Sequence, residues 1–352
     1  MQSKRNTSIS LCLSGTGYRA MLFQAGSLLR LNELGLLRKI NRLTSVSAAS
    51  ITTGVLAAHW QTLAFDATGV STNLSEVLVP PLRTLSSTSP SRTLLGPLLR
   101  TSPGAFLSKR YSQVLFGSRT LREIPDRPSF RFVAKNLLSG QPWCFTKYSS
   151  GDAQVGHILG DELHISDVVV ASSAPQVFPL RMDLRGFRWK PSRNHVDSNL
   201  RTSALLCENE VLDALTVKRV LNKSTVVLVS DGGSLLPSKA ADPCSAELRR
   251  ALHKGSHVGA HWGLTSGVNV FQVAGALTCR TAVVSRVLDL RSGYETVSEY
   301  AQDLLIDWGY AITDAAVRRF VPWLGNSGES PFHSPNDLFR FSPTARFKGA
   351  AA

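Results

Sequence analysis

The sequence predicts an α/β fold in which a mainly parallel sheet is covered by helices. Residues 8–14 alternate as a strand does, and the turn Gly15-Thr16-Gly17 leads into apolar residues at helical spacing over 18–34. A second strand over 43–46 turns at once into another helix. This repeated order of strand, turn and helix favours parallel strands joined by helices. A continuous apolar run within 224–230 adds a central strand buried on both faces.

Weaker patterns predict further elements, namely strands at 130–134 and 143–145 and helices at 242–253 and 294–321. Residues 86–104 are rich in Ser, Pro, Leu and Arg and lack a clear period, which indicates a surface insertion or lid. The chain after 321 is rich in Pro, Ser and Gly. We therefore expect one domain over 8–321 and a disordered tail over 322–352.

Composition and charge limit the classes of partner. The 352 residues are 43% hydrophobic and 18% charged, enough apolar content for a large core. The net charge of +14 favours anionic surfaces, and we expect peripheral contact with anionic membranes. Nucleic acid is not expected as a partner, because the sequence contains neither a metal-finger spacing nor interleaved aromatic and basic residues.

Cysteine usage and hydropathy indicate a cytoplasmic protein without metal or cofactor. The five cysteines are odd in number, lie far apart and form no C-x-x-C pair, so we expect neither a zinc site nor a disulfide framework. No stretch reaches the ~18–20 apolar residues of a membrane span. The Lys4-Arg5 pair precedes an apolar run that contains serines and flows into the glycine turn, which favours a core strand over a secretion signal.

The turn Gly15-Thr16-Gly17 presents backbone N–H groups at a helix N-terminus, where they can bind negative charge. Continued to Ala20, it matches the loose form of the dinucleotide fingerprint. That fingerprint also needs an acidic residue about 20 positions further on. No Asp or Glu lies between Leu34 and Phe65, so the interpretation as an oxyanion hole for acyl transfer is favoured.

Ser47 occupies the next strand-to-helix turn, the position of the nucleophile in the G-x-S-x-G elbow of acyl-hydrolases. Ser45 and Ala49 stand at the two glycine positions. Each adds a Cβ atom and raises the cost of a positive φ. A lone serine in such a run is more often a helix N-cap, and the preceding glycine turn is what favours a nucleophile.

These residues carry a resemblance to a known family. Residues 11–20 (LCLSGTGYRA) and 45–51 (SVSAASI) resemble the two opening motifs of the patatin-like phospholipases, and the intervening 25–37 resembles bacterial members. A weaker similarity continues through the segments 171–175, 259–263 and 308–310. The resemblance implies a three-layer α/β/α fold and hydrolysis of acyl esters of phospholipids or other glycerolipids.

The resemblance also assigns roles within a Ser/Asp dyad that has no histidine. Ser47 would attack the ester carbonyl, an aspartate would act as general base, and the amides of Gly15, Thr16 and Gly17 would hold the oxyanion. Arg19, beside the glycine turn, would either bind a lipid phosphate or brace the turn by an ion pair.

The dyad aspartate has more than one candidate. The family motif D-G-G occurs intact at Asp231, but that position comes about 34 residues later than the expected Asp197, whose two glycines are replaced by Ser198 and Asn199. A rival alignment places Arg193 at the catalytic position and leaves no base. We take Asp197 as the base and Asp231 as the reserve, because a carboxylate within reach of the serine is the least that the chemistry requires.

Two alternatives to an active dyad remain open at this stage. Three histidines follow both aspartates in the chain order of a Ser-Asp-His hydrolase, namely His253, His257 and His261. The second alternative is a catalytically degenerate relative that binds lipid or a partner without turnover. Departures from the motifs at Ala20, Ser45, Ala49 and the altered D-G-G favour that alternative, whereas the intact Ser47 and glycine turn favour an enzyme.

Overall fold

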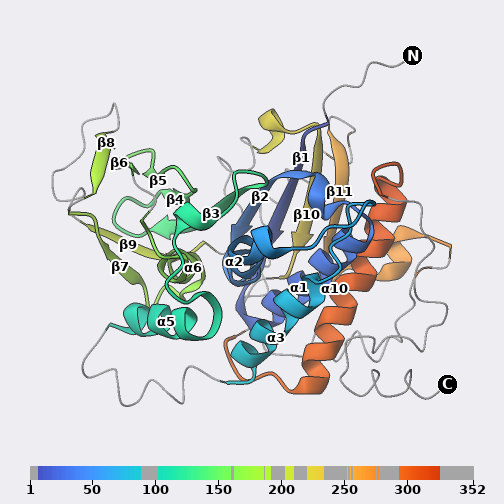
Figure 1. Ribbon diagram of the computed structural model, residues 1–352, viewed down its shortest axis with the longest axis horizontal. Helices are drawn as coiled ribbons and strands as arrows, with labels where there is room; N and C mark the ends of the chain where they lie inside the picture. Colours follow the sequence, from blue (N-terminus) through green and yellow to red (C-terminus); the bar gives the residue numbers. More distant parts are fainter. Residues whose placement is uncertain are drawn as a thin grey trace.

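A mixed sheet of eleven strands forms the centre of the described part of the chain (Figure 1). The computed structural model describes residues 7–88, 102–159, 162–185, 187–191, 203–209, 220–233, 257–274 and 293–325, with 252, 254 and 276. The strand order is β11-β10-β1-β2-β3-β4-β5-β6-β8, and β9 pairs with both β3 and β7.

The first five strands of this order run parallel, which confirms the predicted α/β class. They are β1 (Ile9–Ser14), β2 (Ile40–Val46), β3 (Ser129–Asn136), β10 (Val226–Asp231) and β11 (Val258–Gly263). Ser14 lies opposite Asp231 and Leu13 opposite Ser45. The carboxyl ends of β10, β1 and β2 therefore meet at one edge, where ligands bind in open α/β sheets.

Beyond β3 the sheet continues with antiparallel strands, most of which the sequence pattern does not predict. They are β4 (Pro142–Phe145), β5 (Ser150–Asp152), β6 (Gly156–Leu159), β7 (Leu180–Asp183), β8 (Arg188–Pro191) and β9 (Ser203–Glu208). Of these, only β4 was expected. Each has three to six residues, which is too short for a period to stand out.

The helices gather into two groups in Figure 1. One group lies on the side of the parallel strands and consists of α1 (Gly17–Glu33), α2 (Ala49–His59), α3 (Leu74–Ser86) and α10 (Glu299–Phe320). Helix α3 packs on α1 and α2 rather than on the strands. The other lies beside the antiparallel strands and consists of α5 (Pro103–Tyr111) and α6 (Ile165–Ser173). Short helical turns occur at Leu37–Lys39, Trp60–Thr62, Ser112–Phe116, Leu121–Glu123 and Val268–Phe271.

The parallel strands are buried on both faces, as a three-layer arrangement requires. Leu11 and Leu13 of β1 belong to the large core that includes α1 and α10. Cys12, which points to the opposite face, packs in a second cluster with Val229 and with Val220 of the helical residues 220–223. Strands buried on both faces read as continuous apolar runs, which is why 224–230 could be predicted.

Helix α1 is held in place by close contact with α10. A Cβ atom on Gly26 would lie 1.8 Å from the carbonyl oxygen of Ile306. A Cβ atom on Gly309 would lie 2.0 Å from the carbonyl oxygen of Phe23. Only glycine permits the two backbones to approach so closely. This contact fixes the position of the N-terminus of α1, which carries the glycine turn.

The boundaries of several predicted segments can be compared with the structure. Helix α10 begins at Glu299 rather than at 294, because the Ser298 hydroxyl accepts a hydrogen bond from the amide of Ala301 and caps it. The predicted insertion begins and ends in helices α3 and α5, and its middle, 89–101, lies outside the described residues.

Two further predicted segments lie largely outside the described residues. These are the predicted helix at 242–253 and the tail from 326 onward. At the start of the predicted tail, Leu324 is buried and its carbonyl accepts a hydrogen bond from Lys39. Among the described helices, none has the length and apolar character needed to cross a membrane.

Candidate active site

Ser47 lies between β2 and α2 in a conformation that side chains rarely adopt. Its φ is 55°, and among the described residues only Gln272 also combines a side chain with a positive φ. A residue held in this region costs of order 1–3 kcal/mol, and such strain is typical of the sharp turn that presents a nucleophilic serine. Ser47 is not the cap of α2, because the N-cap position belongs to Ala48.

The Ser47 hydroxyl contacts a carboxylate that sequence reasoning did not select. Ser47 Oγ donates a hydrogen bond of 2.8 Å to Oε2 of Glu208, and Oγ1 of Thr16 lies 3.2 Å from the same Oγ. Ser47 and Thr16 are fully buried, and Glu208 is 2% exposed. A serine hydroxyl and a buried carboxylate at this distance have the geometry of a nucleophile and its base.

Glu208 reaches Ser47 because β9 pairs with the last residues of β3. Strands β2 and β3 are parallel, and β9 runs antiparallel to β3 with Glu208 opposite Ala134. The Glu208 amide donates a 2.8 Å hydrogen bond to the carbonyl of Ala174, just beyond α6. The last residue of β9 is thereby held at the carboxyl end of β2, where Ser47 follows.

The two departures from glycine in the elbow are accommodated locally. Ser45 is fully buried, and its Oγ accepts a 2.9 Å hydrogen bond from Ser50, whose Oγ lies 2.8 Å from that of Ser172. The Ala49 amide donates to the carbonyl of Gly15 at 3.3 Å, so the elbow and the glycine turn are joined directly. The substituted elbow therefore retains its turn.

The glycine turn has the backbone conformation that its glycines permit. Gly15 has φ 126° and Gly17 has φ 76°. The amide of Thr16 is already engaged, since it donates a 2.9 Å hydrogen bond to the carbonyl of Gly233. Gly17 is the first residue of α1, where an amide has no intrahelical acceptor and the helix dipole favours negative charge.

The segment Asp231-Gly232-Gly233 packs against the glycine turn. A Cβ atom on Gly232 would lie 2.6 Å from the Cβ of Ala20, and one on Gly15 would lie 2.7 Å from the same methyl group. Asp231 Oδ1 accepts hydrogen bonds from the Gly233 amide at 3.0 Å and the Ser14 hydroxyl at 3.2 Å. Strand β1 lies between β10, which ends at Asp231, and β2, which leads into the elbow. One strand therefore separates this carboxylate from the turn that contains Ser47.

The other predicted site residues fall in different places. Asp197 and the rival Arg193 lie outside the described residues, as does His253. Arg19 lies in the first turn of α1, with Nη2 3.5 Å from the position of a Cβ on Gly233, and burial lowers its pKa. His261 lies on β11, where it pairs with Val229 of β10, and two strands separate β11 from β2.

The motif of an aspartate followed by glycines does not point to Glu208, which is followed by Asn209 and Glu210. The available signal was different: a single carboxylate ends the apolar run from Ala204 to Cys207. A buried strand that ends on a charged residue indicates a partner at the sheet edge. Among the described residues, no group of three or more His, Cys, Asp or Glu side chains could hold a metal ion.

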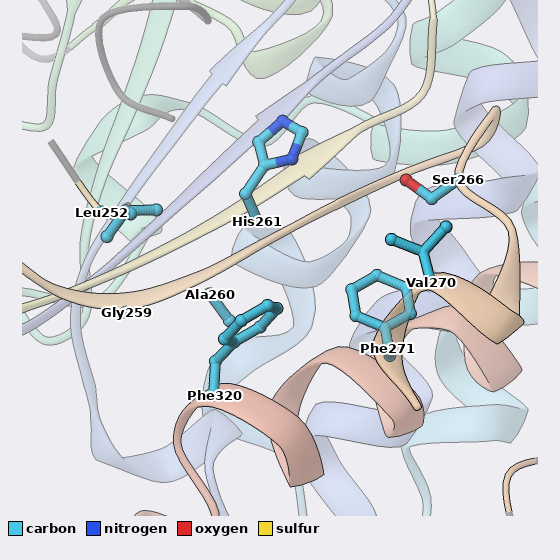
Figure 2. A pocket seen from close by; sticks show the side chains of 8 residues that line it. All are labelled: Leu252, Gly259, Ala260, His261, Ser266, Val270, Phe271 and Phe320. Carbon is cyan, nitrogen blue, oxygen red and sulfur yellow. The ribbon is translucent and has the colours of Figure 1, made fainter. Parts of the chain in front are cut away.

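A separate hollow lies at the outer edge of the sheet, between β11, the turn Val268–Phe271 and the end of α10 (Figure 2). Phe271 and Phe320 meet there edge to face, with ring centroids 6.0 Å apart. The hollow contains none of the residues around Ser47. Its lining consists of Leu252, Gly259, Ala260, His261, Ser266, Val270, Phe271 and Phe320.

Comparison with known proteins shows the fold. No family model matches the chain, and no curated protein matches it in sequence. It is similar to the solved structure of human GIVD cytosolic phospholipase A2, with a TM-score of 0.57 and 12% identity over 89% of this chain and 60% of that one. The complex of that protein with methyl γ-linolenyl fluorophosphonate gives a TM-score of 0.54, with 13% identity over 89% and 59%.

The chain thus spans about three fifths of the length of these neighbours. At such low identity the likeness concerns the arrangement of strands and helices. It agrees with the α/β fold that the resemblance to patatin-like phospholipases implies.

Proposed function

We propose that this protein is a serine hydrolase of carboxylic esters in lipids, with Ser47 as nucleophile and Glu208 as general base. The observation that carries the proposal is the hydrogen bond of 2.8 Å between Ser47 Oγ and Glu208 Oε2, made by a serine held at φ 55°. In this proposal the base is a glutamate from β9, in place of the aspartate that the resemblance implies.

The reaction follows from these positions. Ser47 Oγ attacks the ester carbonyl carbon while its proton passes to the Glu208 carboxylate. The oxyanion that forms is held at the turn Gly15–Gly17 with the N-terminal dipole of α1, and the amide of Gly17, the first residue of that helix, donates to it. Protonated Glu208 gives its proton to the leaving alcohol, and then takes one from the water that attacks the acyl-enzyme. When the bond between the acyl carbon and Ser47 Oγ breaks, the fatty acid leaves and Glu208 returns this proton to Ser47.

The burial of Ser47 and Glu208 favours the alternative function, lipid binding without turnover. Ser47 and Thr16 have no exposed surface in this conformation, so a lipid must first gain access to them. A degenerate protein that binds lipid without turnover would tolerate such a closed site. We favour the enzyme, because strain at Ser47 and a buried carboxylate both lower stability and have no evident structural benefit.

A lipid-like fluorophosphonate separates the two functions, since it forms a covalent bond with an activated serine. The phospholipase neighbour was solved with methyl γ-linolenyl fluorophosphonate, which makes that compound a suitable probe. We expect intact-mass analysis to show one adduct on the wild type and none on Ser47→Ala. Ser50→Ala is the matched control, a buried serine of the same turn. Absence of labelling, or equal labelling of Ser47→Ala, would contradict the enzyme.

A further inference from the structure

Two buried hydrogen-bond donors near the candidate dyad have no partner among the described residues. The Tyr18 side chain is fully buried, and its hydroxyl makes no hydrogen bond to this part of the chain. The Nε atom of Arg110 is likewise buried and has no partner there. Leaving a buried donor unsatisfied costs about 1–3 kcal/mol, so each such group in a folded protein needs an explanation.

These two donors lie in one place, which the contacts around them define. Arg110 Nη2 donates to the Thr88 carbonyl at 3.0 Å, which holds the guanidinium at the end of α3. The Val297 amide donates to the Ser86 carbonyl at 2.9 Å, so the segment 293–297 meets the same helix end. That segment returns to Tyr18, whose amide donates to the Gly293 carbonyl at 3.0 Å.

The same place adjoins Glu208. The rings of Tyr18 and Tyr294 meet edge to face with centroids 5.2 Å apart. The Tyr294 hydroxyl donates to the Ser173 carbonyl at 2.5 Å, and the next carbonyl along the chain, that of Ala174, accepts the Glu208 amide. Tyr18 thus contacts Tyr294, and Tyr294 is bonded to the segment 173–174 that also holds Glu208.

The electrostatics of this region favour an anion. Burial raises the pKa of the Tyr18 phenol, Tyr111 raises it further, and the Arg110 guanidinium opposes both, so Tyr18 stays a neutral donor beside a cation. None of the carboxylates in the described part of the chain forms an ion pair with Arg110. An arginine with a free N–H and an adjacent hydroxyl donor suits a phosphate group.

We propose that Arg110 and Tyr18 form the subsite for the phosphate of a phospholipid substrate. The inference rests on the proposed function, because it names the headgroup of the lipid whose ester Ser47 attacks. In a glycerophospholipid the phosphate is only a few bonds from the ester carbonyls, which matches donors that adjoin Glu208. The carboxylic ester is cleaved at Ser47, and the phosphate is held without reacting.

Binding to the full chain carrying Ser47→Ala tests this subsite without turnover. The probes are dihexanoyl phosphatidic acid and dihexanoylglycerol, which differ only in the phosphate, and calorimetry measures both dissociation constants. We expect Arg110→Gln and Tyr18→Phe each to weaken binding of the phosphatidic acid ~10- to 100-fold relative to the diglyceride. Lys109→Gln, a change of the same charge at the exposed neighbouring position, should alter it by less than about twofold.

Two further arms separate folding effects and the source of the phosphate. Tyr18→Phe removes a hydroxyl that makes no hydrogen bond, so its melting temperature should not fall below that of the parent. It keeps the test decisive if Arg110→Gln does not fold. Inorganic phosphate should compete with the phosphatidic acid only at far higher concentration, whereas equal potency would assign the site to free phosphate rather than to a lipid headgroup.

The outcomes for the subsite and for the enzyme are distinct. Equal losses for both probes, an unchanged ratio in both variants, or a Lys109→Gln effect as large as that of Arg110→Gln would overturn the subsite. Phosphate-dependent binding together with no fluorophosphonate adduct would overturn the enzyme and leave the subsite standing. A fluorophosphonate adduct without phosphate-dependent binding would overturn the subsite and leave the enzyme standing.

Discussion

Ser47 and Glu208 are separated by 161 positions in the chain, yet their side chains share a hydrogen bond of 2.8 Å at the end of the parallel sheet. Both residues are buried. The contact joins the strained turn after β2 to the last residue of β9, which the sequence pattern did not connect.

Replacement of the carboxylate at this contact is the first prediction. Glu208→Gln should lower the rate of ester hydrolysis by about 10²–10⁴, because an amide cannot accept the serine proton. Asp231→Asn should retain a measurable rate, because among the described residues the Asp231 carboxylate bonds only within its own turn and to Ser14. The assay is release of fatty acid from a phospholipid. An active Glu208→Gln enzyme that Asp197→Asn inactivates would return the base role to Asp197.

The contact between Gly232 and Ala20 leads to a stability prediction. Gly232→Ala should lower the free energy of unfolding by about 1–3 kcal/mol, because the new Cβ would lie 2.6 Å from the Ala20 methyl and 2.9 Å from the Ser14 carbonyl oxygen. Urea denaturation measures the change. Gly267→Ala is the control, since its Cβ would have its nearest contact at 3.8 Å.

A second substitution shows whether this contact is the cause. Ala20→Gly removes the methyl group nearest to the new Cβ, so the double variant should recover part of the loss in a double-mutant cycle. Simple additivity of the two single changes would show that Gly232 is required for another reason.

Buried neutral acids predict a loss of stability at alkaline pH. Burial raises the pKa of the Cys12 thiol to about 12 from an ordinary 9.0, and that of the Tyr111 phenol to about 12 from 10.0. The folded state therefore keeps protons that the unfolded chain releases, so stability is full below about pH 9 and falls as the pH rises toward 12.

Denaturant titrations from pH 8 to 12 measure this slope. Tyr111→Phe should flatten the part of the decline above pH 10, because its titrating phenol is gone. A free energy of unfolding that stays constant over this range would contradict the prediction.

The positive charge predicts salt-sensitive contact with membranes. A net charge of +14 should attract the protein to vesicles that contain phosphatidylserine, and added salt should weaken the binding because it screens the charges. Sedimentation with vesicles at increasing sodium chloride measures it. Binding that does not change with salt would indicate insertion of apolar side chains instead.

The parallel strands and their turns could be predicted because their signals are local and strong. Val226–Val229 form a continuous apolar run, and Gly15 and Gly17 mark a turn that few other residues could form. The proposed base could not be predicted in the same way, because Glu208 belongs to a six-residue strand and lies in no glycine motif. Its contact with Ser47 depends on where β9 pairs with β3, a long-range pairing that local patterns do not carry.

The intact D-G-G sequence shows the opposite case, a strong motif whose contacts in the structure are those of a support. A side chain at Gly232 would collide with the methyl group of Ala20, and the Gly233 carbonyl accepts a hydrogen bond from the Thr16 amide. A motif that commonly carries a catalytic aspartate can thus also be explained by packing alone. The distance from the aspartate to the serine distinguishes a catalytic motif from a packing motif, whereas the spacing of residues in the sequence does not.

The pairing of β1 with β10 has a consequence for how the chain is made. Ser14 and Asp231 lie 217 positions apart, so β1 leaves the ribosome long before its second neighbour exists. Until Val226–Asp231 is synthesised, one side of an apolar strand presents unpaired backbone groups, which are a template for association with other chains. Fragments that end before β10 should therefore collect in the insoluble fraction, while the full chain stays in the supernatant.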